Sequence, residues 1–89
     1  MPKTTISKSK TISDTAERFS DDDIFYWSGN FHVYDADVYY GDGVIMDAIG
    51  EQNSVISFDR GSLKDIFFQN KTPGQTAKVV FVGTIETED

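Results

Sequence analysis

From Ile24 onward, short segments of β-branched and aromatic residues alternate with clusters of glycine, proline, asparagine, aspartate and serine. Residues of the first kind favour strands and residues of the second kind favour turns. A turn every 8–12 residues or so is typical of an all-β domain. The pattern therefore predicts a small sandwich or barrel of about six antiparallel strands. The expected strands are residues 24–27, 31–40, 44–49, 55–59, 63–69 and 76–86, with a helical turn expected at most at 47–49.

Three of the expected turns contain residues that particular turn geometries require. Gly41-Asp42-Gly43 supplies residues that tolerate a positive φ angle, which predicts a hairpin at this point. Pro73-Gly74 is typical of a type II turn and should connect the last two strands. Ser28-Gly29-Asn30 is expected to form a turn after the first strand.

The last two expected strands are apolar on both faces. Ile66, Phe67 and Phe68 follow one another directly, and so do the four apolar residues 79–82. A strand that is buried on one face alone alternates between apolar and polar residues, so both faces are expected to be covered here. The second sheet of the domain is expected to cover one face of these strands. The other face is covered either by a partner chain or by the curvature of a barrel.

The first 19 residues differ from the rest of the chain. Residues 1–19 contain four basic and two acidic residues, whereas residues 20–89 contain four basic and thirteen acidic residues. We therefore expect a polar, basic N-terminal arm, 1–19, followed by an acidic all-β domain, 20–89. The β-branched residues of the arm suit a strand that is added to the sheet edge of a neighbouring subunit, and a terminus without a partner is the alternative. Removal of the arm should then leave a folded domain.

Composition excludes several classes of site. The chain has 89 residues, no cysteine and one histidine, His32. A disulfide framework, a thiolate metal site and a multi-histidine site within one chain are therefore excluded. A domain of this size buries about 60–65% of its unfolded surface, and such small domains often gain stability by oligomerising. We expect no secretory signal and no membrane contact, since no apolar run approaches the roughly 20 residues of a membrane span.

The clearest candidate for chemistry is a group of acidic residues. Asp35, Asp37 and Asp42 lie near one another in sequence, and clustered carboxylates in a turn can bind calcium. Their spacing does not match the EF-hand loop. We expect solvated acids and neither a metal nor a cofactor, with calcium as the alternative. His32 lies close by without an accompanying nucleophile, so a structural role is expected for it. Because no phosphate-binding loop or nucleophile elbow occurs, no enzyme activity is expected.

Two alternatives from other functional classes stay open. Trp27, Tyr39 and Tyr40 are candidates for a stacking platform, which would make the chain a carbohydrate-binding module. The acidic domain disfavours nucleic acid as a partner, but it suits an inhibitor that mimics nucleic acid. The residues that such a mimic would use are Asp21, Asp22, Asp23, Asp35, Asp37, Asp42 and Asp47.

The C-terminal part of the chain carries a resemblance. Residues 55–86, VISFDRGSLKDIFFQNKTPGQTAKVVFVGTIE, combine an SLKDIFF element, a polar TPGQTA turn and a final VVFVGT strand. In these features they resemble the C-terminal part of small virion proteins of tailed phages. The resemblance implies a non-enzymatic structural component that decorates or cements a capsid, or that belongs to the head–tail joint or the tail. Such a protein is made in the cytoplasm of a bacterial host and is located in the virion.

The apolar strands and the arm together give an expected interface. We expect a homo-oligomer that forms through the C-terminal strands, and the resemblance adds other virion proteins, such as the major capsid protein, as partners. Neither nucleic acid nor a membrane is expected as a partner. The expected interface residues are Ile6, Ile12, Phe67, Phe68, Val80, Phe81 and Val82.

Overall fold

The computed structural model of the chain describes residues 3–22, 24–72 and 74–86. Nine strands and one turn of 3-10 helix follow one another along these residues: β1 (Lys3–Ile12), β2 (Glu17–Arg18), β3 (Phe25–Tyr34), β4 (Val38–Gly41), β5 (Ala48–Gly50), β6 (Val55–Phe58), β7 (Gly61–Ser62), η1 (Leu63–Asp65), β8 (Phe67–Asn70) and β9 (Ala77–Glu86).

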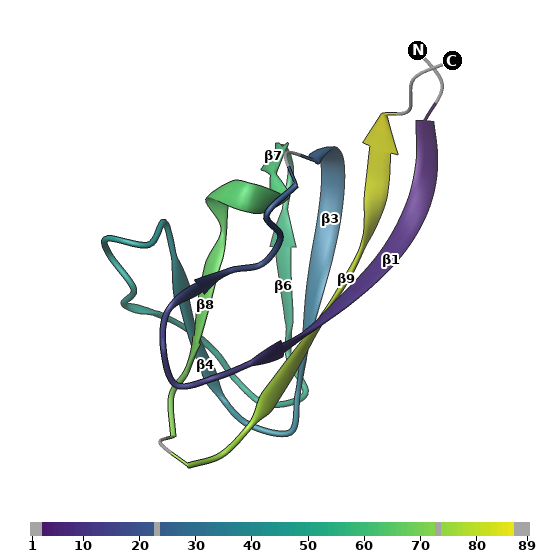
Figure 1. Ribbon diagram of the computed structural model, residues 1–89. Helices are drawn as coiled ribbons and strands as arrows, with labels where there is room; N and C mark the ends of the chain where they lie inside the picture. The colour runs from purple at the N-terminus through teal and green to yellow at the C-terminus, as the bar shows by residue number, and fades with distance from the viewer. Residues whose placement is uncertain (1–2, 23, 73, 87–89) are drawn as a thin grey trace.

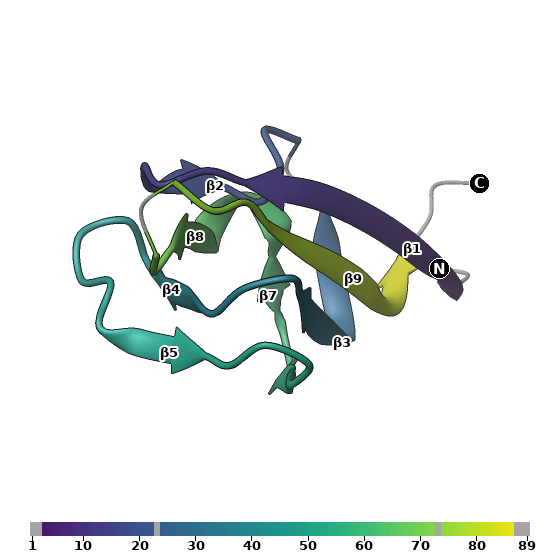
Figure 2. The ribbon, with the colours of Figure 1, turned by 90° about the horizontal axis from the view of Figure 1, so that it is seen from below.

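The strands form two antiparallel sheets that face each other, which confirms the expected small all-β sandwich. The larger sheet has the strand order β1-β9-β3-β6, and β7 pairs with the start of β3. The smaller sheet has the order β2-β8-β4-β5. Figure 1 shows β1 and β9 running side by side along the larger sheet, and Figure 2 shows β4, β5 and β8 on the opposite side of the molecule. The chain leaves β3 at Asp35, whose positive φ of 75° turns the backbone toward the smaller sheet.

The turn expected at residues 28–30 is not formed, and β3 continues through it. The backbone of Gly29 pairs with Gly83 of β9, and the Phe81 ring covers this pair of glycines. A Cβ atom on Gly29 would lie within 2.8 Å of Cζ of Phe81, and a Cβ atom on Gly83 would also overlap the ring. Gly29 is therefore required by the packing of an aromatic ring on its strand and not by a turn.

The core between the sheets is built largely of aromatic rings. The ring centroids of Phe31 and Phe81, both from the larger sheet, are 5.0 Å apart, and that of Phe31 lies 5.3 Å from Phe68 of the smaller sheet. Aromatic pairs at such distances add about 0.5–1.5 kcal/mol each beyond the area that they bury. The buried hydrophobic residues of the described chain are Ile12, Phe19, Tyr26, Phe31, Val33, Ala36, Val38, Leu63, Ile66, Phe68, Ala77, Val79 and Phe81.

The expected N-terminal arm is instead part of the sandwich. β1 pairs along its whole length with β9 of the same chain. Ile12 is fully buried, and the Phe19 ring lies 5.1 Å from that of Phe31 and 5.8 Å from that of Phe68. The sheet edge that the arm was expected to find on a neighbouring subunit is thus present in its own chain. Pairing within the chain avoids the loss of translational and rotational freedom that association costs.

The expected interface residues are separated by the alternation of the strands. Ile12, Phe68 and Phe81 are fully buried in the core of their own chain, so no second chain can reach them, and the expectation for these three residues is corrected. Alternate residues of β9 point to opposite faces. Val80 and Val82 therefore lie on the outer face of the larger sheet, where Val82 is 36% exposed.

The other two expected interface residues are partly covered by their own chain. Ile6 is half-buried and packs against the core, on the inner face of β1 opposite Gly83. Phe67 is half-buried, and the guanidinium carbon of Arg18 lies 5.2 Å from the centre of its ring. A Cβ atom on Gly43 would lie 2.9 Å from the same ring, so the β4–β5 connection crosses it. The second apolar face of β8 is therefore covered without a partner.

The turn at residues 72–75 forms as the sequence pattern predicts, whereas the helical turn forms at another place. Gly74 has a φ of +83° and Gln75 N donates to Thr72 O at 3.2 Å, as the expected type II turn requires; Pro73 lies outside the described residues. The helical turn forms at Leu63–Asp65 and not at 47–49. Its N-cap, Ser62, accepts a hydrogen bond from Lys64 N. The strand expected from residue 63 consequently begins at residue 67.

Because residues 1–19 are part of the sandwich, their removal is no longer expected to leave a folded domain. A chain that lacks residues 1–19 should not fold, because it loses the strand that covers the β9 edge together with Ile12 and Phe19. Truncation of a buried Ile or Phe to Ala alone costs about 2–5 kcal/mol, and small domains have only about 5–15 kcal/mol in total. Thr11→Ala, at an exposed position beside Ile12, is the control and should change stability by at most about 0.5 kcal/mol. Thermal unfolding followed by circular dichroism measures both, and a cooperative transition in the truncated chain would contradict this account.

Candidate functional site

The β4–β5 connection presents the most exposed large apolar side chains of the described residues. β4 and β5 pair from Val38↔Gly50 to Tyr40↔Ala48, which confirms the expected hairpin. The connection is a loop of residues 42–47, and the third strand begins at Ala48, later than expected. Within the loop, Val44 is 89% exposed and Ile45 is 61% exposed.

Asp42 gives this loop its shape. Its Oδ1 atom accepts hydrogen bonds from the backbone N–H groups of Val44, at 2.9 Å, and Ile45, at 2.8 Å. The bond from Ile45 and then that from Val44 hold the pKa of the Asp42 carboxyl below its ordinary value of 3.8. Gly43 follows with a φ of +94°, which a glycine adopts without strain. The two apolar side chains are therefore projected by a hydrogen-bonded turn.

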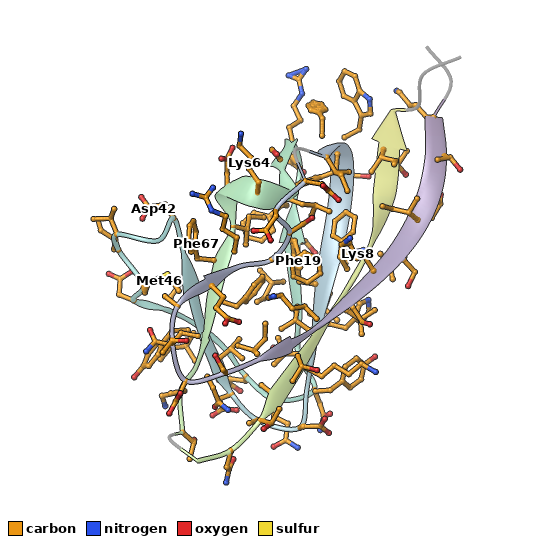
Figure 3. All side chains as sticks on the ribbon, viewed as in Figure 1. Lys8, Phe19, Asp42, Met46, Lys64 and Phe67 are labelled. Atoms are coloured by element: carbon orange, nitrogen blue, oxygen red, sulfur yellow. The ribbon has the colours of Figure 1, made fainter. Side chains whose placement is uncertain are left out.

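A cleft of about 270 Å³ lies beside the loop, where the loop, the end of β6 and η1 meet. Figure 3 shows Asp42 and Met46 on the loop and Lys64 on η1 at the same end of the sandwich. The walls of the cleft are mainly apolar, and the three acidic residues that line it are all exposed. The lining residues are Tyr40, Gly41, Asp42, Ile45, Asp47, Ala48, Phe58, Asp65 and Ile66.

The walls of the cleft continue the aromatic core. The rings of Tyr40 and Phe58 meet edge to face with centroids 6.2 Å apart, and Phe58 contacts Phe31 in the same way at 5.6 Å. Burial raises the pKa of the Tyr26 hydroxyl above its ordinary 10.0, and the negative charge of Asp65, which lines the cleft, raises it further. The cleft thus combines rigid apolar walls with negative charge at its opening.

The aspartates that were alternative calcium ligands lie at opposite ends of β4. Asp37, before β4, accepts a hydrogen bond from Gln52 N at 2.7 Å. Asp42, after β4, is engaged by the loop. Across residues 3–22, 24–72 and 74–86, no three histidine, aspartate or glutamate side chains come together as a metal ion would require.

The three rings of the alternative carbohydrate platform do not share a surface. Tyr39 and Tyr40 are adjacent in β4 and so point to opposite faces of the smaller sheet. Trp27 belongs to the other sheet. Its ring has Lys3 Nζ 4.6 Å from its centre and Arg60 Cζ at 5.2 Å. Two cations of the same chain therefore occupy the surroundings of this ring.

His32 lies on the outer face of the larger sheet. It is half-buried, pairs with Val80 and Val55, and stacks on Tyr34 with ring centroids 6.5 Å apart. Val55, Tyr34 and Val82 are 51%, 43% and 36% exposed. This face therefore carries a second apolar strip, flatter than the projecting loop.

The sequence pattern marks Tyr40, Asp42 and Asp47 as candidates for other kinds of site, but it does not mark the apolar residues of the loop and the cleft. The Val-Ile-Met run after Gly43 predicts the start of a strand, in which alternate side chains would be buried. The signal that could have found the loop is Asp42 itself, because an aspartate often accepts hydrogen bonds from backbone groups two or three residues ahead.

No protein-family model matches this chain, and neither the curated proteins nor the solved structures give a match. Among the residues that the structure describes, no helix has the length and apolar character that crossing a bilayer requires.

The role of Asp42 predicts a pH dependence of the loop. Because the folded pKa is depressed, the hydrogen bonds to the carboxylate are fully present above pH 3.8 and are lost as pH falls through the lower, folded value. In a titration followed by NMR, the amide signals of Val44 and Ile45 should change with a midpoint below 3.8. Asp42→Asn retains an acceptor oxygen and should keep the loop without this titration, whereas Asp42→Ala should speed amide exchange at both residues. A midpoint at or above 3.8 would show that the carboxylate does not hold the loop.

Proposed function

We propose that the chain is a non-enzymatic structural subunit of a larger assembly. The assembly is the virion of a tailed phage, in which the chain decorates or cements the capsid or belongs to the head–tail joint or the tail. The projecting β4–β5 loop carries this proposal, because it holds Val44 and Ile45 in water, 89% and 61% exposed, beside an apolar cleft. Exposed apolar surface that is gathered in one place marks a contact site with another macromolecule. The resemblance of residues 55–86 to virion proteins supplies the kind of assembly.

The size of the loop suits a repeated, individually weak contact. Full burial of a Val or Ile side chain contributes about 1.5–3 kcal/mol. Two such side chains together contribute about 3–6 kcal/mol, which reaches only the lower end of the cost of association, about 4–15 kcal/mol. Subunits that attach at many positions of one particle, or through more than one contact each, can be retained even when every contact is weak. A decorating or cementing role is consistent with this balance.

The β1 edge of the larger sheet favours attachment by side chains over attachment by an added strand. In β1, Lys8 and Lys10 lie opposite Phe81 and Val79, and so point to the inner face of the sheet. Lys10 also lies 3.9 Å from the carboxylate of Glu17. Inward-pointing charges on an edge strand are a common device that prevents edge-to-edge pairing. The loop is therefore a better contact in this proposal than the addition of the β1 strand to a neighbouring sheet edge.

The test is the presence of the chain in particles from the culture that produces it. The chain should co-purify with phage particles on a density gradient, in a fixed ratio to the major capsid protein. A double variant, Val44→Asp with Ile45→Asp, should reduce the bound fraction at least tenfold, because charge replaces the apolar contact. Its unfolding free energy should change by no more than about 0.5 kcal/mol per substitution, since both positions are exposed.

Val55→Asp is the control, because it makes one substitution of the same kind at an exposed valine of the opposite sheet. It should leave the bound fraction unchanged. Equal binding of the double variant and the unmodified chain would exclude the loop as the contact. Absence of the chain from all particles would exclude the virion.

A further inference from the structure

We infer that the cleft beside the β4–β5 loop is the docking site for a basic segment of a partner protein. The segment places one aliphatic or aromatic side chain between the apolar walls and its lysine or arginine residues against the aspartates at the opening. This inference rests on the proposed function and gives the chemistry of the partner at that contact.

The volume of the cleft fits one inserted side chain. It measures about 270 Å³, whereas small-molecule sites occupy roughly 300–1,000 Å³ and a cavity of about 150 Å³ holds a benzene ring. Tyr40 and Phe58 form rigid aromatic walls, and Ile66 adds an aliphatic one. Ile45 both lines the cleft and is 61% exposed, so it can contact the inserted side chain and the segment around it.

The charge at the opening selects a basic segment. Asp42, Asp47 and Asp65 line the cleft and are exposed, and none of the lining residues in the described chain is basic. Lys64 lies on the same turn as Asp65 but does not line the cleft. Exposed ion pairs are individually weak, so the inserted apolar side chain carries the affinity and the aspartates determine which partner is accepted.

The same charge opposes a symmetric contact in which two copies of this chain meet cleft to cleft. Two copies that met through this cleft would bring the three aspartates of one against the three aspartates of the other, and like charges in a contact oppose association. The basic residues of β1 are not available to relieve this repulsion. Lys8 and Lys10 point to the inner face of their own sheet, and Lys10 already lies beside Glu17.

The experiment is an NMR titration of the full chain with three short peptides. The peptides are Lys-Lys-Leu-Lys-Lys, the same peptide with serine in place of leucine, and Glu-Glu-Leu-Glu-Glu. The leucine-containing basic peptide should shift the amide signals of residues 40–48, 58, 65 and 66, with an affinity at least tenfold above that of the serine peptide. The acidic peptide should not bind. Equal binding of the two basic peptides would show diffuse attraction to an acidic protein and would overturn the inference, as would shifts that map to another face.

Charge variants test the opening itself. Asp47→Asn combined with Asp65→Asn should weaken the leucine-containing basic peptide at least fivefold, while Asp42 is kept because it shapes the loop. Asp21→Asn combined with Asp22→Asn removes the same charge away from the cleft and should have no such effect. Equal weakening by both pairs would overturn the inference.

If the peptide does not bind but the chain is present in particles, only this inference fails. If the peptide binds but the chain is absent from particles, the proposed function fails and the docking site remains.

Discussion

The structure depends on the packing of the Phe81 ring over the backbone of Gly29 and Gly83. A side chain on either glycine would overlap the ring. With the ring in place, β3 and β9 pair from Tyr26↔Ile85 to Tyr34↔Lys78, and both neighbouring strands add to this central pair. An aromatic ring that covers strand glycines restores the packing that glycine lacks. The same ring reaches across the core, since its centroid lies 6.3 Å from that of Phe19.

The position of this aromatic cluster also explains where the candidate site lies. The large rings fill the middle of the sandwich, and the Phe58 and Tyr40 rings extend the apolar surface toward one end. At that end the chain does not close over the core, because the loop held by Asp42 turns outward and exposes Val44. A domain of this size buries a smaller fraction of its surface than a larger domain does. The apolar surface that remains open beside the loop is the feature on which the proposed contact depends.

The fold class could be predicted from the sequence, whereas the residues that each strand buries could not. Alternating segments and turn residues predict the sandwich, the β4–β5 hairpin and the turn at Gly74, because these follow from local preferences. The role of Gly29 is set by Phe81, which is far away in sequence, so a local reading takes Ser28-Gly29-Asn30 as a turn. Residues 1–19 look like an arm because β1 is polar on one face and carries lysines on the other, yet β9 offers it an edge in the same chain. The loop escaped prediction because hydrogen bonds to the Asp42 side chain, and not a propensity, hold Val44 and Ile45 out of the strand that follows.

The most direct test of the central packing is a double-mutant cycle between positions 29 and 81. Gly29→Ala places a methyl group against the ring and should destabilise the protein by about 1–3 kcal/mol. Phe81→Leu removes the ring edge that meets this methyl group, so the same alanine should cost at least about 1 kcal/mol less in the leucine background. The measurement is urea unfolding of the unmodified protein, the two single variants and the double variant. Additive effects, within about 0.3–0.5 kcal/mol, would show that the two sites are independent and would contradict the account.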